Sequence, residues 1–289
     1  MARTLLPGQT CRILLVDPAS GRSEVVFENA TTLVEAPNWS PDGRWLVVNG
    51  DGGLWRLPVE GVSAGSRVLT PVEMRGVAEI NNDHVIAPDG SVVFVSARDG
   101  HLYEVPFDGG EGRRVTQDHP EGRGYKNYLH GVSPDGSTLS VIVGARPDAV
   151  AGPESWQTNV ALVSVADGTT TFLTDDEHAD DGAEFSPGGE WIWFTTERFT
   201  TAPGHSQLAR MRVDGSELSQ VTATDTVDWF PHPSPDDTML LSLAFEAGTE
   251  GHPENRDVVL RILKLTDGAP TRRRRASCSC SSAARARST

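Results

Sequence analysis

Three histidines occupy nearly equivalent positions in a repeating pattern and have the chemistry of metal ligands or acid–base catalysts. His84 and His130 each lie three residues before a turn motif, and His232 lies two residues before another, as does Glu184. Imidazole and carboxylate groups suit Mn, Fe or Zn, and histidine transfers protons near neutral pH. The four residues predict a divalent-metal or acid–base site. Histidines that cap strands or bridge neighbouring elements would show the same pattern.

A polar segment closer to the C-terminus supplies further candidates. It contains His252, Asn255 and Arg256, and an arginine guanidinium binds a carboxylate through two parallel hydrogen bonds. An acidic sugar fits such a residue, with Trp156 or Trp229 stacked on its ring. Alternatively, Arg256 pairs with a carboxylate of this chain and Trp229 packs in the interior. The candidate ligand-binding residues are Asn82, Tyr128, Asp181, Trp229, Asn255 and Arg256, and the candidate catalytic residues are His84, His130, His232 and His252.

Five tight turns divide the chain into the repeats that must position these residues. They recur at intervals of 46 to 53 residues and share a Ser-Pro-Asp-Gly pattern. Proline presets the first φ angle, aspartate accepts hydrogen bonds from nearby backbone N–H groups, and glycine adopts the left-handed conformation. Each motif therefore predicts a β-hairpin. The motifs are Ser40–Gly43, Ala87–Gly90, Ser133–Gly136, Ser186–Gly189 and Ser234–Asp237.

The segment after each turn has the apolar, β-branched or aromatic composition of a buried strand. A further strand and then a shorter one follow in each repeat. Four short strands per repeat are typical of a propeller blade, and no long amphipathic helix supports a parallel α/β fold. The buried strands are expected at residues 45–48, 92–95, 139–143, 191–194 and 239–243.

The repeats resemble those of TolB-like β-propellers. The resemblance rests on the Ser-Pro-Asp-Gly turns, on Trp39 and Phe185 just before two of them, and on strands that end in Asp-Gly, over about residues 10–268. It implies an all-β propeller of the six-bladed type. The same repeats are similar to the propeller of oligogalacturonate lyases, which use channel histidines with a metal, and to the N-terminal propellers of prolyl-oligopeptidase relatives. The resemblance therefore leaves both a scaffold and an enzyme open.

The repeat count predicts a ring with one incomplete blade. Residues 11–17 and 23–28 have the pattern of two outer strands whose inner partners would come from the C-terminal end. After Gly268, a basic and serine-rich segment replaces the expected outer strand of the fifth blade and the inner strands of the sixth. We predict one propeller domain over residues 1–270, with five full blades, half of a sixth and an open ring, followed by a disordered or aberrant tail over residues 271–289.

Propeller geometry sorts the loops onto two faces. The turn motifs lie on one face, and the loops between blades lie on the other together with three long insertions, at residues 144–159, 197–207 and 245–257. The candidate site residues belong to this second face. His130 and Glu184 differ in phase by one residue, so alternation along a strand would direct them to opposite sides unless a bulge intervenes, which Gly131 could supply.

Composition and charge exclude several functional classes. The net charge is −15, and six arginines lie in the tail, so the rest of the chain is strongly acidic and would repel nucleic acid. No apolar run approaches the roughly 20 residues that span a bilayer. Pro7 interrupts the N-terminal segment before a signal-peptide core can form, and three cysteines are too few for a disulfide framework. We expect a cytoplasmic protein without a membrane span.

The functional prediction has two alternatives. The leading one is a scaffold that binds a protein partner or a small acidic carbohydrate on its insertion-bearing face. The other is a metal-assisted carbohydrate lyase or hydrolase that uses the channel histidines. A serine hydrolase is not expected, because Gly61–Gly65 matches the nucleophile-elbow pattern but lacks the strand before it and the helix after it. Oligomeric state, and the way in which the ring closes, stay undetermined.

Overall fold

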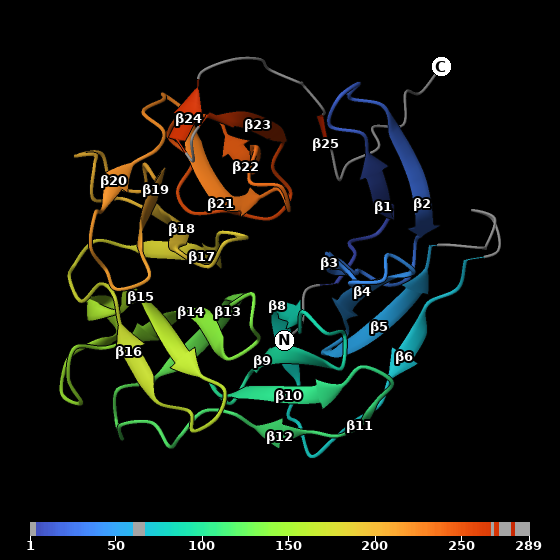
Figure 1. The fold of residues 1–289 in the computed structure, drawn as a ribbon, viewed down its shortest axis with the longest axis horizontal. Coiled ribbons are helices and arrows are strands. Elements are labelled where there is room, and N and C mark those ends of the chain that lie inside the picture. Colours follow the sequence, from blue (N-terminus) through green and yellow to red (C-terminus); the bar gives the residue numbers. More distant parts are fainter. Residues whose placement is uncertain (1–3, 60–66, 267–268, 272–278, 281–289) are drawn as a thin grey trace.

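The computed structural model describes residues 4–59, 67–266, 269–271 and 279–280, and they form an all-β propeller (Figure 1). Its sheets radiate around a central channel, and a short 3-10 turn at Pro153–Ser155 lies within one of the long insertions. Within the described residues, no helix is long and apolar enough to cross a membrane. The expected all-β propeller is therefore confirmed.

Five blades contain four antiparallel strands each, which follow one another in sequence order from the channel outward. The first two blades are β3 (Glu35–Trp39), β4 (Trp45–Gly50), β5 (Gly53–Pro58) and β6 (Thr70–Val72), then β8 (Ile80–Ile86), β9 (Val92–Ala97), β10 (Leu102–Pro106) and β12 (Arg113–Arg114). The third and fourth are β13 (Lys126–Val132), β14 (Thr138–Ala145), β15 (Gln157–Ser164) and β16 (Thr170–Phe172), then β17 (Asp180–Phe185), β18 (Trp191–Thr196), β19 (Gln207–Arg212) and β20 (Ser219–Gln220). The fifth is β21 (Val227–Pro233), β22 (Met239–Phe245), β23 (Val258–Thr266) and β24 (Ala269–Thr271).

The remaining strands lie beside these blades. β1 (Cys11–Val16) and β2 (Ser23–Asn29) form a separate antiparallel pair next to the first blade, and β25 (Ser279–Cys280) pairs with β23. β7 (Met74–Arg75) and β11 (Gly110–Glu111) form a short parallel pair that links the first two blades.

The predicted turns are present, and side-chain hydrogen bonds explain their sequence. Ser40 Oγ donates to Asp42 Oδ1 (2.5 Å) and accepts from the backbone N–H of Trp45 (3.0 Å), which closes the first hairpin. Gly90 has a φ of 73°, which glycine adopts without strain, and its Cβ position lies 3.6 Å from Pro41 of the preceding turn. The first two turns therefore meet at one end of the channel.

The hydrophobic core lies between successive sheets. In the first four blades the second strand is buried on both faces, as in β9, where Val93, Phe94 and Val95 are at most 2% exposed. Between the fourth and fifth blades, Trp193 packs in a cluster with Leu240. These clusters between the sheets hold the innermost strands, and hence the candidate site residues, in place.

The blade count differs in part from the prediction. The described residues form five four-stranded blades and the β1–β2 pair, so the six-bladed count is not confirmed. The outer strand expected to be missing from the fifth blade is present as β24, because residues 269–271 continue the chain back along β23. Two parts of the predicted tail, residues 272–278 and 281–289, lie outside the described residues, as does the whole nucleophile-elbow motif at 61–65.

Candidate functional site

Each innermost strand contains a register shift, and the shift decides where its polar side chains point. An extra residue on one strand of an antiparallel pair turns the following side chains toward the other face. The shifts lie between Glu35 and Asn38, Ile80 and His84, Leu129 and Gly131, Asp181 and Glu184, and Trp229 and His232. The bulge predicted in the third blade is confirmed, and it recurs in every four-stranded blade.

In the third blade, His130 is itself the bulged residue. Its neighbours on both sides keep their partners on β14, whereas His130 has none in register. The Cβ position of Gly131 lies 2.5 Å from Ser140 Oγ and 3.2 Å from the Cα of Glu184, so a glycine is needed where the third blade approaches the fourth. This close approach directs the imidazole of His130 toward the start of β17.

Side chains of three blades meet there. His130 Nε2 lies 3.0 Å from Asp181 Oδ1, and His252 Nε2, from the insertion after β22, lies 3.5 Å from Asp181 Oδ2. The ring of His252 makes edge contacts with Trp229 and Phe230, at centroid separations of 4.9 and 5.0 Å. The carboxylate of Asp181 is therefore held between two imidazoles beside an aromatic wall.

A fourth blade adds Asp83 to this group. Asn81 Nδ2 donates to Asp83 Oδ2 (2.7 Å), and the carboxyl group is close enough to His130 and Asp181 for their charges to act on it. Burial raises the pKa of Asp83 to about 6, against the opposing charge of His130. We call Asp83, His130, Asp181 and His252 the channel-mouth cluster.

The electrostatics of the channel-mouth cluster separate the pKa values of its members. Burial alone would lower the pKa of His130, but the hydrogen bond and charge of Asp181, with the charge of Asp83, raise it above its ordinary value. Burial also disfavours the charged form of Asp181, yet His130 and His252 hold the pKa of that carboxyl well below its usual range. Asp181 thus stays ionised, His130 holds its proton more tightly than a free imidazole does, and Asp83 titrates near pH 6.

The other two predicted histidines have different surroundings. His232 Nδ1 forms a short hydrogen bond with Glu184 Oε2, and its side chain is 57% exposed. His84 is buried, its Nε2 lies 3.2 Å from the carbonyl oxygen of Val47, and burial lowers its pKa to about 4. His84 therefore bonds between blades as a neutral core histidine.

The predicted metal ligands are consequently not assembled into one set. His130 pairs with Asp181, His232 pairs with Glu184, and His84 faces a backbone carbonyl. In the described part of the chain, no group of three or more His, Cys, Asp or Glu residues has a geometry that could hold a metal ion. The arrangement fits proton transfer and ion pairing better than the predicted four-ligand centre.

Two predicted aromatic residues, Tyr128 and Trp156, adjoin each other, and Tyr128 lies near the channel-mouth cluster. Burial raises the pKa of Tyr128, and the nearby charges of Asp83 and Asp181 raise it further. The Cβ position of Gly144 lies 2.5 Å from the ring of Trp156 and 3.0 Å from the ring of Tyr128, so the two rings adjoin across β14. Trp156 is 38% exposed, which leaves part of its ring open to a ligand.

The remaining predicted residues are dispersed. Asn82 lines a cavity of about 110 Å³ between the first and second blades. Asn255 Oδ1 accepts a hydrogen bond from Gln9 Nε2 (2.6 Å), which joins the last insertion to the N-terminal segment. Arg256 is exposed. Asn82 adjoins the channel-mouth cluster only through the backbone, as the residue before Asp83, and its side chain lines the separate cavity.

Two residues of the site, Asp83 and Phe230, were not among the predicted residues. Asp83 carried a signal, since it belongs to an Asn-Asn-Asp-His segment that is unusually polar for the start of a buried strand. Phe230 carried none. Its φ of 52° depends on tertiary contacts, because its backbone N–H donates to Thr195 Oγ1 (3.1 Å) and the Cβ position of Gly182 lies 2.9 Å from its ring.

Comparisons with known proteins agree with this architecture. No family model matches the chain. A curated relative from Agrobacterium fabrum (strain C58), with the name "Uncharacterized protein Atu1656", is 35% identical over 241 residues, which cover 82% of this chain and 74% of the relative. A solved structure from Agrobacterium tumefaciens, assigned as TolB, is 32% identical with a TM-score of 0.75 and covers 90% of this chain and 86% of its own. The chain belongs to the TolB-like β-propeller family.

More distant structures share only the fold of this TolB-like propeller. TolB from Acinetobacter baumannii is 17% identical with a TM-score of 0.59, and the alignment covers 91% of this chain and 62% of the other. An oligogalacturonate lyase in complex with manganese is 15% identical with a TM-score of 0.57, covering 91% and 72%.

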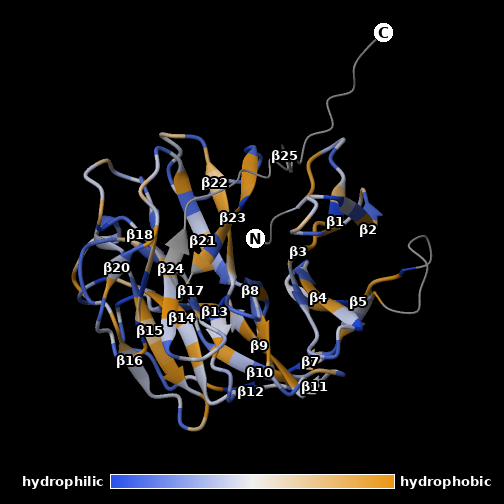
Figure 2. Cartoon of the chain, turned by 45° about the horizontal axis from the view of Figure 1, so that its top comes forward, coloured by the Kyte–Doolittle hydropathy of each residue, from blue (hydrophilic) through white to orange (hydrophobic). Residues whose placement is uncertain are grey.

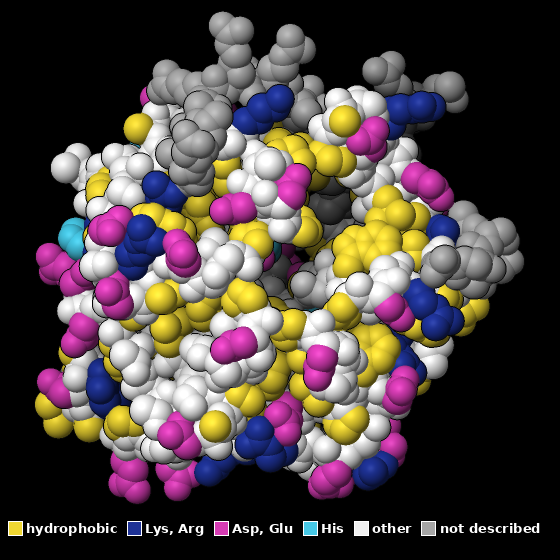
Figure 3. Space-filling model, in the orientation of Figure 1, with side chains coloured by type: hydrophobic (Ala, Val, Ile, Leu, Met, Phe, Trp, Pro, Cys, Tyr) yellow, Lys and Arg dark blue, Asp and Glu magenta, His cyan; other side chains and the backbone are white. Residues whose placement is uncertain are grey.

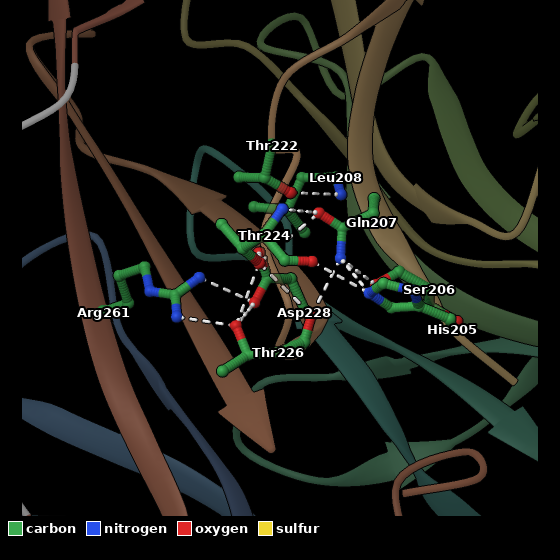
Figure 4. A network of polar contacts seen from close by, with 9 residues as sticks. All are labelled: His205, Ser206, Gln207, Leu208, Thr222, Thr224, Thr226, Asp228 and Arg261. Carbon is green, nitrogen blue, oxygen red and sulfur yellow. Dashed lines mark hydrogen bonds and ion pairs between the residues drawn. The ribbon is translucent and has the colours of Figure 1, made fainter. Parts of the chain in front are cut away.

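Two buried ion pairs hold the innermost strands of this TolB-like propeller behind the channel-mouth cluster. Asp180, just before Asp181, bonds Arg198 Nη2 at 2.9 Å. In the next blade, Asp228 is fully buried and accepts from Arg261 Nη1 at 2.7 Å, within a network of threonine and glutamine side chains (Figure 4). These contacts fix the starts of β17 and β21, and the site residues Asp181 and Trp229 come directly after Asp180 and Asp228.

Proposed function

We propose that this TolB-like propeller is a binding protein whose ligand contacts the channel-mouth cluster. The observation that carries the proposal is the convergence of Asp83, His130, Asp181 and His252 from four successive blades. Burying charged groups costs stability unless they are paired, and a buried cluster of titratable groups with shifted pKa values is characteristic of functional sites. The long insertions that supply His252 and Trp156 belong to the same face.

The composition of the site favours a polar ligand with a ring. Imidazole N–H groups donate hydrogen bonds to a carboxylate, the carboxyl groups accept hydrogen bonds from hydroxyls, and the rings of Tyr128 and Trp156 offer flat apolar surfaces. A small acidic carbohydrate combines all three features. A protein partner with an acidic side chain on an extended loop would use the same contacts, and the acidic surface of the chain argues against nucleic acid.

A thermal-shift and calorimetric screen of acidic and neutral oligosaccharides tests this proposal. Binding should weaken at least tenfold in His252→Gln, which removes one imidazole from Asp181. His178→Gln is the matched control, because His178 is an exposed histidine on a loop between blades. Equal binding by both variants would show that the ligand does not contact the channel-mouth cluster.

A second candidate function is acid–base catalysis on a carbohydrate. Asp83, with a pKa of about 6, provides a base, and His130, whose pKa the two carboxyl groups raise, provides a neighbouring acid. In a lyase reaction, the base would remove the proton next to the sugar carboxylate, and the acid would protonate the departing oxygen. An oligogalacturonate lyase that is 15% identical to this chain has a similar fold, and its structure is a complex with manganese.

Product analysis separates this candidate from a binding protein. Incubation with oligogalacturonate should generate an unsaturated uronate with ultraviolet absorbance, and His130→Gln should reduce the rate by orders of magnitude. The sequence prediction of Mn, Fe or Zn is tested by elemental analysis of protein purified without chelators, comparing the wild type with a variant that carries alanine at His84, His130 and His232. Bound ligand without product would leave the scaffold function.

We also propose that the ring follows the six-bladed plan, with β1 and β2 in the places of the third and fourth strands of a sixth blade. The support comes from packing. Cys11 and Ile13 of β1 lie in one cluster with Val34 and Leu46 of the first blade, as third strands do elsewhere in the ring.

A further inference from the structure

A large cleft separates the fifth blade from the β1–β2 pair. It has a volume of about 970 Å³ and opens where Figure 3 shows a hollow bordered by hydrophobic side chains. Apolar residues of β1, β3, β22 and β23 line most of it, and Figure 2 shows β22 and β23 with hydrophobic residues beside the gap. Representative lining residues are Leu14, Val16, Trp39, Leu241, Leu260 and Ile262.

The cleft meets β1 along the edge of the strand. Four consecutive residues, Ile13–Val16, border it, although alternate residues of a strand point to opposite faces. A cavity that reaches both faces of one strand must lie beside its edge. β1 pairs with β2 on its other side, and within the described residues no strand pairs with the edge that faces the cleft. That edge therefore presents backbone N–H and C=O groups to an incoming strand.

The facing side of the fifth blade has the character of an uncovered blade interface. Leu241 occupies the seventh position after the start of its turn motif and is 36% exposed. The corresponding residues of the other four blades are covered by a neighbouring sheet and are at most 2% exposed: Val47, Phe94, Ser140 and Trp193. Trp39, across the cleft, is 48% exposed. Both walls of the cleft thus continue the inter-blade core of the ring, and none of the described residues forms a sheet between them.

The other blades show which structural element would fill the cleft. In each of them two innermost strands form a hairpin through the turn motif, and the second strand of that hairpin pairs antiparallel with the third strand. β1 stands in the place of a third strand. Asp17 is the one acidic residue among those that line the cleft, and the rest of the lining is uncharged apart from His232, so an apolar hairpin meets no opposing charge at its centre.

We propose that the cleft is a docking site for a β-hairpin of a partner protein. The second strand of this hairpin is apolar on both faces and pairs antiparallel with β1, and its side chains cover Leu241 and Ile262 on one side and Trp39 on the other. Recognition is of the strand-addition type, in which backbone hydrogen bonds supply affinity and apolar pockets supply specificity. This site is separate from the channel-mouth cluster and does not depend on its function.

One of the chain's own innermost hairpins can serve as a test ligand for the cleft. A synthetic peptide with the sequence of residues 35–50 reproduces one innermost hairpin, including β3, the turn and β4. We expect the labelled peptide to bind the full chain in fluorescence anisotropy and to slow hydrogen exchange at the amides of β1 but not at those of β16. A peptide with proline in place of Val47 is the control, because proline removes a ladder hydrogen bond.

Protein variants locate the binding. Leu241→Lys should weaken binding of the peptide at least tenfold, since it places a charge in the cleft. Leu218→Lys is the control and should leave binding unchanged, because Leu218 is similarly exposed, at 40%, but lies on the loop before β20. No binding, or binding that leaves β1 unprotected, overturns the proposal. Self-association that Leu241→Lys abolishes, without peptide binding, would identify a second copy as the occupant and overturn it too.

Discussion

The raised pKa of Asp83 leads to a prediction about stability as a function of pH. A carboxyl group whose pKa is higher in the folded than in the unfolded state binds its proton more tightly in the folded state. Its contribution to stability is therefore complete below the unfolded pKa of 3.8 and is lost as the pH rises through about 6. Above that pH, the ionised carboxylate of Asp83 destabilises the fold.

The size of the stability change follows from the pKa shift of Asp83. A change of about two pKa units corresponds to about 3 kcal/mol at 1.36 kcal/mol per unit. Because Asp83 is half-buried and water screens part of its charge, we expect about 1–3 kcal/mol. Asp83→Asn keeps an oxygen that can accept from Asn81 but carries no charge. The variant should match the wild type at pH 4 and should be more stable by about 1–3 kcal/mol at pH 8.

Urea unfolding followed by tryptophan fluorescence at the two pH values measures this difference. Asp135→Asn is a control of opposite sign. Hydrogen bonds from Ser133 and Ser137 lower the pKa of Asp135 to about 2, so its contribution is present above pH 3.8 and is lost as the pH falls through 2. That variant should lose stability at pH 8. If Asp83→Asn gains nothing at pH 8 relative to pH 4, burial does not govern the protonation of Asp83.

Two further predictions concern the framework around the site, and urea unfolding at pH 7 measures both. Arg261→Met should lower the free energy of unfolding by about 3–5 kcal/mol, because it leaves Asp228 buried without its cation. Adding Asp228→Asn should recover part of this loss. A double variant no more stable than the single one would contradict the reasoning. Gly131→Ala should cost about 1–3 kcal/mol, because the new Cβ lies 2.5 Å from Ser140 Oγ, and Gly188→Ala is its control, with nothing within 4 Å of its Cβ position. Equal costs for the two alanine variants would contradict the crowding at Gly131.

The turn motifs carry local information, and this is why the blades could be predicted. Ser40, Asp42 and Gly43 form their hydrogen bonds and left-handed conformation within one hairpin, so their chemistry is readable without knowledge of the rest of the ring. The apolar strands after the turns are equally legible, since a strand buried on both faces contains mostly apolar residues. The sequence also indicated that the pattern of a complete sixth blade is missing.

The candidate site depends on long-range contacts that no short segment encodes. His84 and His130 hold the same position before their turns, yet His84 comes after the bulge of β8 and turns into the core, whereas His130 is the bulged residue of β13 and reaches Asp181. Where a bulge falls depends on the neighbouring blade, as the close approach of Gly131 to Glu184 shows.

The class of fold, the repeat length, the turn chemistry and the set of polar residues near one face were all legible in the sequence. Which of these polar residues meet depends on how the blades pack. This packing joined His130, Asp181 and His252 from three blades, left His84 in the core, and opened the cleft between β1 and β22. The physical reason is that hydrogen bonds within a turn act over a few residues, whereas packing between sheets joins residues that are far apart in the sequence, such as His130 and Asp181.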